Sequence, residues 1–472
     1  MSSVSVEQLI AAAARRFSLP GGVVALVDGD ETALYPFGTT RLGGSGNVDA
    51  ATTFSIASCS KAFTACAVAL LVDAGGLAWD DPVRTHLPEF ELHDPWISAH
   101  ITLRDLLGMR TGLGRAGICE WGSNPSLALP EIFRRLRHTQ PVSGFRERYG
   151  YTNVAYSALS EIVGRAAGTD FAGFVRDGIF VPLGMPNAFL SEGTPARTVN
   201  CAFPHTRIDE VVASLPAPRC GGRLGESCGY LSGADAAAWM RFLLEAQAPP
   251  RLLRQPVFAE MFLPQSLGTA EPRLGRAFQN YCMGWEACDY FGDPVFCHEG
   301  GEFGASSRTM LDRARRLGIA VYLNISSPAV RALSLEIYDH CRGRPHRDWS
   351  GELPGWMASE AETRVAEAQR AYAFDAGTSA PFAADAFEGA FSSPVNGMLR
   401  LTRSERGYDA VFEDSSVLDG AFEHLGGAVY RLAPAYAGMQ DNLKGRVRVR
   451  LAGAGDARRI DVMGVGVFDA VS

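Results

Sequence analysis

The chain has 472 residues, of which 47% are hydrophobic and 20% are charged, so it can bury a large core and is neither a disordered tail nor a coiled coil. At roughly 150 residues per domain, this length predicts two or three domains rather than one small module. The 44 basic and 52 acidic residues leave a net charge of −8, opposite in sign to the surface that a nucleic-acid backbone requires, so nucleic acid is not an expected partner.

The N-terminal segment predicts a helix rather than a targeting signal. Ser5 and Gln8 have the spacing of a capping box, and Leu9, Ile10 and Phe17 supply apolar contacts. The segment lacks a basic region followed by a continuous apolar stretch, and no run of about 18 apolar residues occurs in the chain. We therefore expect a cytoplasmic protein with no membrane partner.

A sheet is predicted to begin directly after this helix. Residues 21–27 and 32–37 read as two short strands joined by an Asp-Gly-Asp turn. Residues 55–76 carry Ala, Leu and Phe at helical spacing and end on Gly-Gly, which predicts a buried helix. Further helical patterns cover residues 103–109, 128–137, 153–167, 170–180 and 234–246.

Strand patterns dominate the rest of the chain. The first group predicts an antiparallel sheet covered by a helix at 328–341, and its strands are 281–289, 295–298, 305–311 and 317–324. Residues 343–383 mix Arg, Pro, Gly and Trp around one polar helix near 359–372, which is typical of a linker. Period-two alternation then marks 398–402, 408–412, 428–433, 446–451 and 459–468. We therefore predict three parts: 1–342, a linker at 343–383, and a small all-β domain at 384–472.

Lysine is almost absent from this chain. Of the 44 basic residues, only Lys61 and Lys444 are lysines. GC-rich codon usage accounts for arginine elsewhere, because the exchange costs little at the surface. Arginine is not deprotonated in a protein, whereas a buried lysine can shift its pKa and act as a base. A site that needs proton transfer would therefore keep its lysine.

Ser58 and Lys61 are the strongest candidates for chemistry. They stand three residues apart near the start of the predicted 55–76 helix, so their side chains lie on one face and can meet. A serine hydroxyl attacks a carbonyl only if a neighbour takes its proton, and an amine in an apolar pocket can do so. The alternative is an exposed helical Ser and Lys without a role.

Two weaker motifs follow along the chain. Tyr151 and Asn153 place a phenol and an amide just before a predicted helix. His298 precedes Glu299, Gly300 and Gly301 between two predicted strands, where the glycines allow a substrate backbone to approach closely. Each of these motifs alone carries little weight, since a single histidine is more often structural.

The order of the three motifs resembles the serine β-lactamase and penicillin-binding-protein family, and in particular its class C β-lactamase-related branch. The resemblance extends to ITLRDLLGMRTGL at 101–113, to 145–164, to IFVPLGM at 179–185 and to GYLSGADAAAW at 229–239, and so covers roughly residues 5–342. It implies an α+β fold in which helices and an all-helical subdomain flank an antiparallel sheet. The C-terminal domain resembles a lipocalin-like β-barrel extension that some members carry.

The resemblance also implies roles for individual residues. Ser58 would be the nucleophile, Lys61 its proton partner, and Tyr151 the general base and later the general acid. Asn153 would hold the substrate amide. The backbone N–H groups of Ser58 and Gly301 would form the oxyanion hole.

His298 stands where many members have lysine. It would polarise Tyr151 or bind substrate, and because a histidine titrates near neutrality, β-lactam or DD-peptidase specificity is not implied. Glu299 and Gly300 are candidate substrate contacts. Neighbouring residues of a strand point to opposite faces, so the sequence leaves open whether Glu299 faces the cleft.

The function implied is a serine hydrolase acting on ester or amide bonds, including those of D-amino-acid peptides, without metal or cofactor. An acyltransferase or peptide cyclase that uses an amine acceptor is one alternative, because the acceptor depends on cleft shape and water exclusion. A β-lactam or peptide sensor that acylates without turnover is another.

Three other features compete with or extend this assignment. Ser227 lies in a Gly-x-Ser-x-Gly sequence at 225–229, but the preceding Pro/Gly-rich residues do not form the buried strand that a nucleophile elbow needs. Cys59 is expected to face the core. Arg446, Arg448 and Arg450 alternate along one predicted strand, as an exposed face or as a site for a substrate carboxylate.

The ten cysteines contain no Cys-x-x-Cys pair, and most are expected to be small buried hydrophobes. Cys282, Cys288, Cys297 and His298 have no common zinc spacing, so no metal site is predicted.

Overall fold

The computed structural model describes residues 4–115, 127–191, 200–208, 211–216, 223–245, 251–302, 304–435 and 446–471. Lys444, Cys119 and Cys220 lie outside these ranges. Within the described residues, no helix combines the length and the apolar composition that crossing a bilayer demands.

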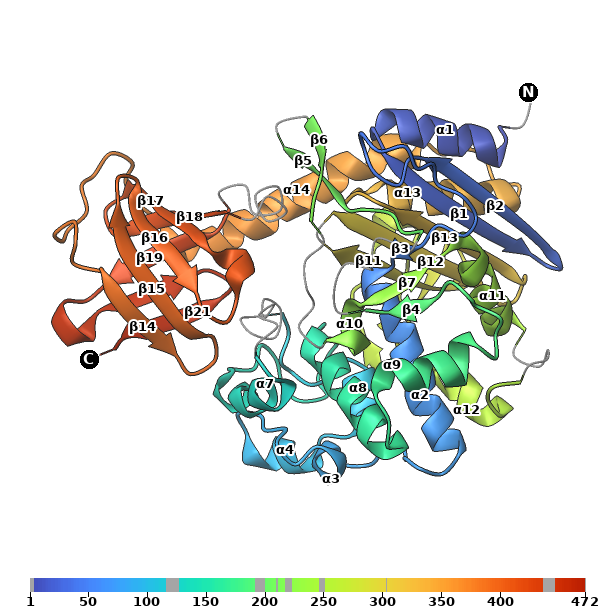
Figure 1. The fold of residues 1–472 in the computed structure, drawn as a ribbon, viewed down its shortest axis with the longest axis horizontal. Helices are drawn as coiled ribbons and strands as arrows, with labels where there is room; N and C mark the ends of the chain where they lie inside the picture. The colour runs from blue at the N-terminus through green and yellow to red at the C-terminus, as the bar shows by residue number, and fades with distance from the viewer. Residues whose placement is uncertain are drawn as a thin grey trace.

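An eight-stranded antiparallel sheet forms the centre of the first domain (Figure 1). Its strands lie in the order β2-β1-β13-β12-β11-β10-β9-β8. Their bounds are β1 (Gly21–Asp28), β2 (Glu31–Gly38), β8 (Ser266–Leu267), β9 (Gln279–Tyr281), β10 (Glu286–Tyr290), β11 (Asp293–Glu302), β12 (Ala305–Asp312) and β13 (Leu317–Leu323). The first and last strands of this unit along the chain thus flank each other near one edge of the sheet: β1 pairs with β13 on one side and with the edge strand β2 on the other.

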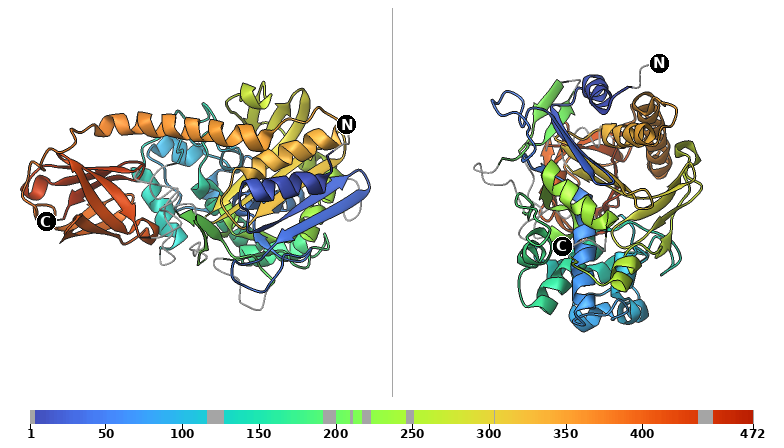
Figure 2. Two further views of the ribbon diagram at one scale, coloured as in Figure 1. Left: turned by 90° about the horizontal axis from the view of Figure 1, so that it is seen from above. Right: turned by 90° about the vertical axis from the view of Figure 1, so that its right-hand side faces the viewer.

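Helices cover both faces of this sheet (Figure 2). On one face lie α1 (Val6–Arg16), α13 (Ala329–Cys341) and the first part of α14 (Trp349–Gln369), and on the other lie α2 (Lys61–Asp73) and α11 (Gly233–Leu244). The alternation of β1 explains the two layers, because Val23 and Ala25 join the core with α2 and α11, whereas Val24 joins the core with α13. The capping box of Ser5 and Gln8 is present at the start of α1.

A helical subdomain packs beside α2 and supplies part of the site. It contains α3 (Val83–His86), α4 (Pro95–His100), α5 (Leu103–Leu107), α7 (Leu129–Arg135), α8 (Asn153–Ala167) and α9 (Phe171–Val175), which continues as a π-helical turn at Arg176–Phe180. Shorter elements complete the domain: β3 (Phe54–Ser55), β4 (Phe189–Leu190), β5 (His205–Ile208), β6 (Val211–Ser214), β7 (Gly229–Leu231), α10 (Leu224–Ser227) and α12 (Gln255–Glu260). The predicted antiparallel sheet with flanking helices and a helical subdomain is confirmed.

The predicted single strand at 281–289 is wrong. It is interrupted at 282–285 between β9 and β10, where Gly284 has a φ of +78°. A Cβ at this position would lie 2.8 Å from the carbonyl oxygen of Lys61, so the turn allows the sheet edge to pass close to α2. The sequence predicted one continuous strand because Cys282, Met283 and Trp285 are apolar. In the structure these three side chains are buried, although their backbone does not form a strand.

The segment predicted as a linker is mostly one helix, α14, which begins ten residues earlier than the polar pattern indicated. Its start is fixed by tertiary contacts. Trp349 is fully buried and donates its indole N–H to Asp339 and to the hydroxyl of Tyr290. Pro354 lies inside the helix, and the polar pattern near 359–372 marked only the part of α14 that follows it. Figure 2 shows α14 running from the first domain to the second.

The second domain is a closed antiparallel barrel of eight strands. The strands are β14 (Gly389–Ser393), β15 (Gly397–Ser404), β16 (Gly407–Phe412), β17 (Gly420–Gly426), β18 (Val429–Pro434), β19 (Arg448–Ala452), β20 (Arg459–Val462) and β21 (Gly466–Ala470). Alternate residues such as Phe391, Leu399, Phe422 and Phe468 fill a core of their own. The alternation pattern missed β14 and β17 and joined β20 to β21, but the all-β character is confirmed.

Candidate active site

Ser58 lies in a tight turn between the sheet and helix α2. The 3-10 turn Ala57–Ser60 precedes Lys61, the first residue of α2. Ala57 has a φ of +43°, which an L-residue adopts only at a cost, so the turn in front of the serine is strained. The neighbouring side chains are buried, but Ser58 itself is partly exposed. The local backbone therefore presents one hydroxyl to the surface of a buried helix.

Lys61 makes three hydrogen bonds from a fully buried position. Its Nζ donates to Ser58 Oγ at 2.9 Å, to Asn153 Oδ1 at 2.9 Å and to the main-chain oxygen of Glu226 at 2.7 Å. All three ammonium protons thus have an oxygen partner. The predicted contact between the two residues of the first motif is present.

The second motif meets the first. Tyr151 precedes α8, and its hydroxyl lies 2.7 Å from Ser58 Oγ. Asn153 is the first residue of α8, where its amide reaches Lys61. Two cations lie over the Tyr151 ring, with Lys61 Nζ at 4.9 Å and Arg115 Cζ at 4.1 Å from its centroid. Ser58 Oγ therefore sits between a phenol and an amine, either of which can exchange a proton with it.

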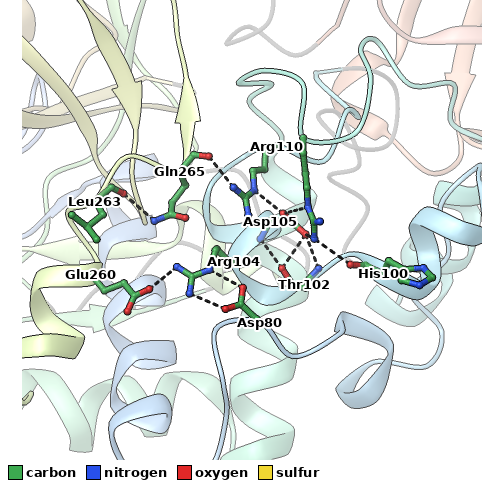
Figure 3. A network of polar contacts seen from close by, with 10 residues as sticks. Asp80, His100, Thr102, Arg104, Asp105, Arg110, Glu260, Leu263 and Gln265 are labelled. Atoms are coloured by element: carbon green, nitrogen blue, oxygen red, sulfur yellow. Dashed lines mark hydrogen bonds and ion pairs between the residues drawn. The ribbon is translucent and has the colours of Figure 1, made fainter.

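A buried carboxylate holds the loop that carries Tyr151 (Figure 3). Asp105 of α5 accepts from Arg110 Nε at 2.6 Å and from Arg146 at 2.7 and 2.9 Å. Burial alone would raise the pKa of Asp105, but hydrogen bonds from Arg146 and Thr102 and the charge of Arg110 hold that pKa below its ordinary value. The ionised carboxylate therefore ties Arg146, which lies five residues before Tyr151, to α5.

The glycines of β11 pass directly beside the nucleophile turn. A Cβ on Gly300 would lie 2.2 Å from the carbonyl oxygen of Ile56 and 3.0 Å from the backbone nitrogen of Ser58, so only glycine fits there. A Cβ on Gly301 would meet nothing within 4 Å. This half of β11 pairs with β12, whereas β10 pairs with β11 only as far as Cys297. The assignment of Gly301 to the oxyanion hole stays a prediction.

His298 is held by hydrogen bonds other than those predicted for it. Its Nδ1 lies 2.7 Å from the carbonyl oxygen of Glu299, and its Nε2 lies 3.1 Å from the hydroxyl of Tyr281. Burial and the nearby charge of Lys61 lower the pKa of His298 to about 3. The imidazole is therefore neutral at physiological pH, which corrects the expectation that it titrates there. Its ring centroid lies 6.5 Å from that of Tyr151, and both nitrogens are engaged elsewhere.

Glu299 lies on the opposite face of the sheet, and we correct its assignment as a substrate contact. Its carboxylate accepts from Arg331 of α13 at 2.6 and 2.8 Å and also pairs with Arg308. Burial alone would raise the pKa of Glu299, but the charges of Arg331 and Arg308 hold it far below its ordinary value. The alternation of β11 separates Glu299 from Ser58.

Among the residues that the structure describes, neither competing nucleophile has a base placed to activate it. Ser227 ends the one-turn helix α10, and the neighbour that the structure gives its hydroxyl is Cys228 Sγ at 4.0 Å. Cys59 donates its thiol to the carbonyl oxygen of His298 at 3.2 Å, and burial raises its pKa to about 12. Neither residue is positioned as an activated nucleophile.

The barrel arginines contact the end of the linker rather than a cleft. Arg448 Cζ lies 5.4 Å from the Phe374 ring centroid, and Arg450 Cζ lies 5.3 Å from that of Tyr372. The main-chain oxygen of Arg446 accepts from Gln369. Arg448 and Arg450 thus pack against the chain that enters the barrel, and the alternative of a substrate-carboxylate site at these arginines stays a prediction. Among the described residues, no group of three or more His, Cys, Asp or Glu side chains is placed to hold a metal ion.

Three residues that the sequence reasoning missed complete the surroundings of the site. Glu226 accepts from Lys61, Tyr281 contacts His298, and Arg115 stacks on Tyr151. They lie 165, 17 and 36 positions from their partners in the sequence, so spacing gave no signal for them.

Comparison with known proteins gives a consistent result. A family model described as Beta-lactamase matches residues 6–342. The unguisins hydrolase ungD' of Aspergillus campestris is 28% identical over 318 residues, which cover 65% of this chain and 58% of that protein. Penicillin-binding protein 4* of Bacillus subtilis is 30% identical over 171 residues, or 35% of this chain and 36% of that protein. The chain thus spans less than two thirds of the length of these curated relatives.

Solved structures share the fold. The octameric penicillin-binding protein homologue from Pyrococcus abyssi has a TM-score of 0.66 at 17% identity, with 100% of both chains covered. SurE has a TM-score of 0.60 at 18% identity, with 99% of this chain and 98% of that chain covered. The class C β-lactamase from Rhodobacter sphaeroides has a TM-score of 0.59 at 19% identity and covers 72% of this chain and 98% of its own.

Proposed function

The chain belongs to the β-lactamase family, and from this premise we propose that it is a serine hydrolase that cleaves ester or amide bonds through an acyl-enzyme on Ser58. One observation carries the proposal. Ser58 Oγ lies 2.7 Å from Tyr151 Oη and 2.9 Å from Lys61 Nζ, at the partly exposed end of a buried helix. This arrangement is the one that an activated serine nucleophile requires.

The reaction begins with proton transfer. In this mechanism Tyr151 acts from its phenolate form, which the ammonium of Lys61 stabilises; it takes the proton of Ser58 as Oγ attacks the substrate carbonyl and thereby becomes a neutral phenol. Tyr151 then delivers the proton to the leaving group. The same phenol activates the acceptor that releases the acyl group, so one residue serves both half-reactions.

The neutral His298 bears on the choice of substrate. A charged side chain at this position would attract a substrate carboxylate, but His298 is buried, uncharged and hydrogen-bonded at both nitrogens. We therefore propose substrates that need no carboxylate at that position, such as esters and amides of peptides, including those with D-residues. Two relatives are named as hydrolases of unguisins, which supports water as the acceptor.

Intact mass spectrometry tests the proposal. Wild type, Ser58→Ala and Ser227→Ala are mixed with a short-chain p-nitrophenyl ester, a D-alanyl amide, a penicillin and a peptidyl thioester, with and without an added amine. We expect a transient adduct in wild type and Ser227→Ala and none in Ser58→Ala. An adduct retained in Ser58→Ala would refute the nucleophile. Release of an amide with the added amine would identify a transferase or cyclase, and a permanent adduct would identify a sensor.

A further inference from the structure

One residue, Met109, holds the backbone on both sides of Tyr151. Met109 lies in the turn that follows helix α5. The N–H of Gly150 donates to its carbonyl oxygen at 2.8 Å, and the N–H of Thr152 donates to its Sδ at 3.3 Å. Met109 and Thr152 are both fully buried, so water does not compete for the second contact. The residues immediately before and after Tyr151 are therefore fixed by the same neighbour.

The backbone that provides this support is strained. Met109 has a φ of +53°, and Arg146, five residues before Tyr151, has a φ of +61°. Residues other than glycine adopt this left-handed region only at a cost, and such conformations persist where surrounding contacts enforce them. The support of Tyr151 therefore requires a group that holds both strained residues in place.

The carboxylate of Asp105 is the group that links the two strained positions (Figure 3). Arg110, the residue after Met109, donates its Nε to Oδ1 at 2.6 Å. Arg146 donates its Nε to Oδ1 at 2.9 Å and its Nη2 to Oδ2 at 2.7 Å. The backbone N–H of Arg146 also donates to the carbonyl oxygen of Arg110 at 3.0 Å. One carboxylate thus fixes the residue next to Met109 and the start of the loop that leads to Tyr151.

Helix α5 in turn fixes this carboxylate. Thr102, the N-cap of α5, donates its backbone N–H and its hydroxyl to Oδ2 of Asp105, both at 2.9 Å. Asp105 is fully buried, and its two oxygens accept two hydrogen bonds from Thr102, one from Arg110 and two from Arg146. Hydrogen bonds between ionised groups are stronger than those between neutral ones. The carboxylate is therefore a rigid point from which both chain segments are held.

We propose that Asp105 is a positioning residue for Tyr151, the general base of the proposed reaction. Through the two arginines it holds Met109 in its strained conformation, and Met109 fixes the chain on both sides of Tyr151. The 2.7 Å contact between the Tyr151 hydroxyl and Ser58 Oγ depends on this support. The inference rests on the proposed function, because it states how the base is kept within reach of the nucleophile. A displacement of about 1 Å at a reacting group can cost about 10²-fold in rate.

A second ion pair of α5 offers a matched control. Arg104 binds Asp80 through Nε at 2.8 Å and through Nη2 at 3.0 Å, and it binds Glu260 through Nη1 at 2.6 Å (Figure 3). The Asp80 side chain is 69% exposed. Asp80→Asn therefore removes a carboxylate that binds the same helix but leaves the hydrogen bonds of Asp105 in place.

A double-mutant cycle tests the proposal. The kcat and KM for a p-nitrophenyl ester are measured for Asp105→Asn and Asp80→Asn, each alone and combined with Tyr151→Phe, with Ser58→Ala as the background. Asp105→Asn keeps the size of the side chain but removes its charge and replaces one acceptor oxygen with a donor. We expect it to lower kcat about 10²-fold with little change in KM.

In the Tyr151→Phe background we expect Asp105→Asn to lower kcat less than about threefold, because the hydroxyl that it positions is absent. Asp80→Asn should stay within about twofold in both backgrounds. A merely structural role of Asp105 would produce the same loss in both backgrounds, and that result would overturn the proposal. A folded Asp105→Asn with the kcat of wild type would also overturn it.

A second variant covers failure to fold. If thermal melting shows that Asp105→Asn is unfolded, Arg146→Gln takes its place, because the Arg146 side chain is 43% exposed and its loss leaves Asp105 paired with Arg110. We expect Arg146→Gln to lower kcat about tenfold, and only where the Tyr151 hydroxyl is present. An equal loss in the Tyr151→Phe background would again contradict the proposal.

Hydrogen exchange separates this inference from the proposed function, because it needs no turnover. The exchange of the peptide that contains the N–H groups of Gly150 and Thr152 is compared in wild type, Asp105→Asn and Asp80→Asn without substrate. We expect it to be at least about tenfold faster in Asp105→Asn alone, because the hydrogen bonds of these two groups loosen. Unchanged exchange would overturn the role of Asp105 whatever the activity. Absence of an acyl adduct on Ser58 would refute the hydrolase and leave the exchange result standing.

Discussion

Two neighbouring residues of strand β11, His298 and Glu299, lie on opposite faces of the sheet and differ in ionisation. His298 faces helix α2, is 2% exposed, and is kept neutral because burial and the charge of Lys61 lower its pKa. Glu299 faces α13 and is kept ionised because Arg308 and Arg331 lower its pKa against the effect of burial. Burial alone would neutralise both residues, so the charge of the neighbours decides which one ionises.

The two faces of the sheet serve different ends: the face with Ser58 supports the reaction, and the face with Glu299 stabilises the fold. On the face with Ser58, the hydroxyl of Ser58 and the amide of Asn153 contact Lys61, and the phenol of Tyr151 contacts Ser58, so proton transfers remain available to the reaction. The face with Glu299 matches carboxylates with guanidinium groups and encloses them beneath α13. Changes on the first face are therefore expected to alter rate, and changes on the second to alter the free energy of unfolding.

The largest effect is expected for Tyr151→Phe. This variant removes the group that we propose as the general base for Ser58, so kcat/KM should fall by about 10³-fold, or roughly 4 kcal/mol. The rate of acylation by a p-nitrophenyl ester measures it. Tyr149→Phe is the matched control, because this ring stacks on Tyr281 and contributes packing. Equal losses in both variants would show that Tyr151 acts through packing alone.

On the other face, Glu299→Gln is expected to destabilise the fold by about 3 kcal/mol, because fully buried Arg308 loses its charged partner. Urea unfolding measures this loss. Glu352→Gln, whose partner Arg347 is partly exposed, should cost less than about 1 kcal/mol. If Glu299→Gln folds as stably as wild type but loses acylation, the division between the two faces is wrong.

The pH dependence of the free energy of unfolding should reveal the lowered pKa of His298. Because the pKa of His298 is about 3 in the folded protein and 6.5 ordinarily, the unfolded chain binds more protons between these values, and stability falls as pH decreases through this range. From pH 6.5 to pH 5.0 this residue alone should cost about 1.5 kcal/mol. His298→Gln should remove that part of the dependence.

Glu299 acts in a different pH range, which keeps the two residues distinguishable. Its folded pKa lies below the ordinary value of 4.5, so its stabilising contribution is complete above that value and is lost only as the pH falls further. The free energy of unfolding is compared between wild type and His298→Gln from pH 6.5 to pH 5.0. If the two proteins lose stability in parallel, His298 is charged in the folded protein and this prediction is wrong.

The smallest effect is expected for the two tyrosines that serve the two faces. Tyr281→Phe removes the hydroxyl beside His298 Nε2, and Tyr290→Phe removes the hydroxyl that donates to Asp339. Each should cost about 1 kcal/mol in urea unfolding. Only Tyr281→Phe should also slow acylation, because it frees His298 to reorient beside the site. Slower acylation in Tyr290→Phe would contradict the separation of the faces.

Local spacing predicted the centre of the site. Ser58 and Lys61 are three residues apart, so the turn and helix they occupy place both side chains on one face, and they meet at 2.9 Å. The same holds for the capping box of α1 and for the alternation that predicted the all-β domain. Such features depend on backbone periodicity, which a sequence displays directly.

Other elements were decided by contacts between distant residues. The start of α14 depends on Trp349 entering a pocket with Tyr290 and Asp339, and this packing outweighs Pro354. The break between β9 and β10 depends on the approach of α2 to Gly284. Neither contact leaves a periodic signal in the chain.

By itself, the sequence determined the family of folds, the order of the motifs and the identity of Ser58, Lys61, Tyr151 and Asn153 as candidates. Only the tertiary structure decided that His298 is neutral, that Glu299 lies behind the sheet and that Glu226 stands beside Lys61. The physical reason is that ionisation and facing depend on which charges and dipoles surround a group in space, and those partners come from elements far apart in the chain.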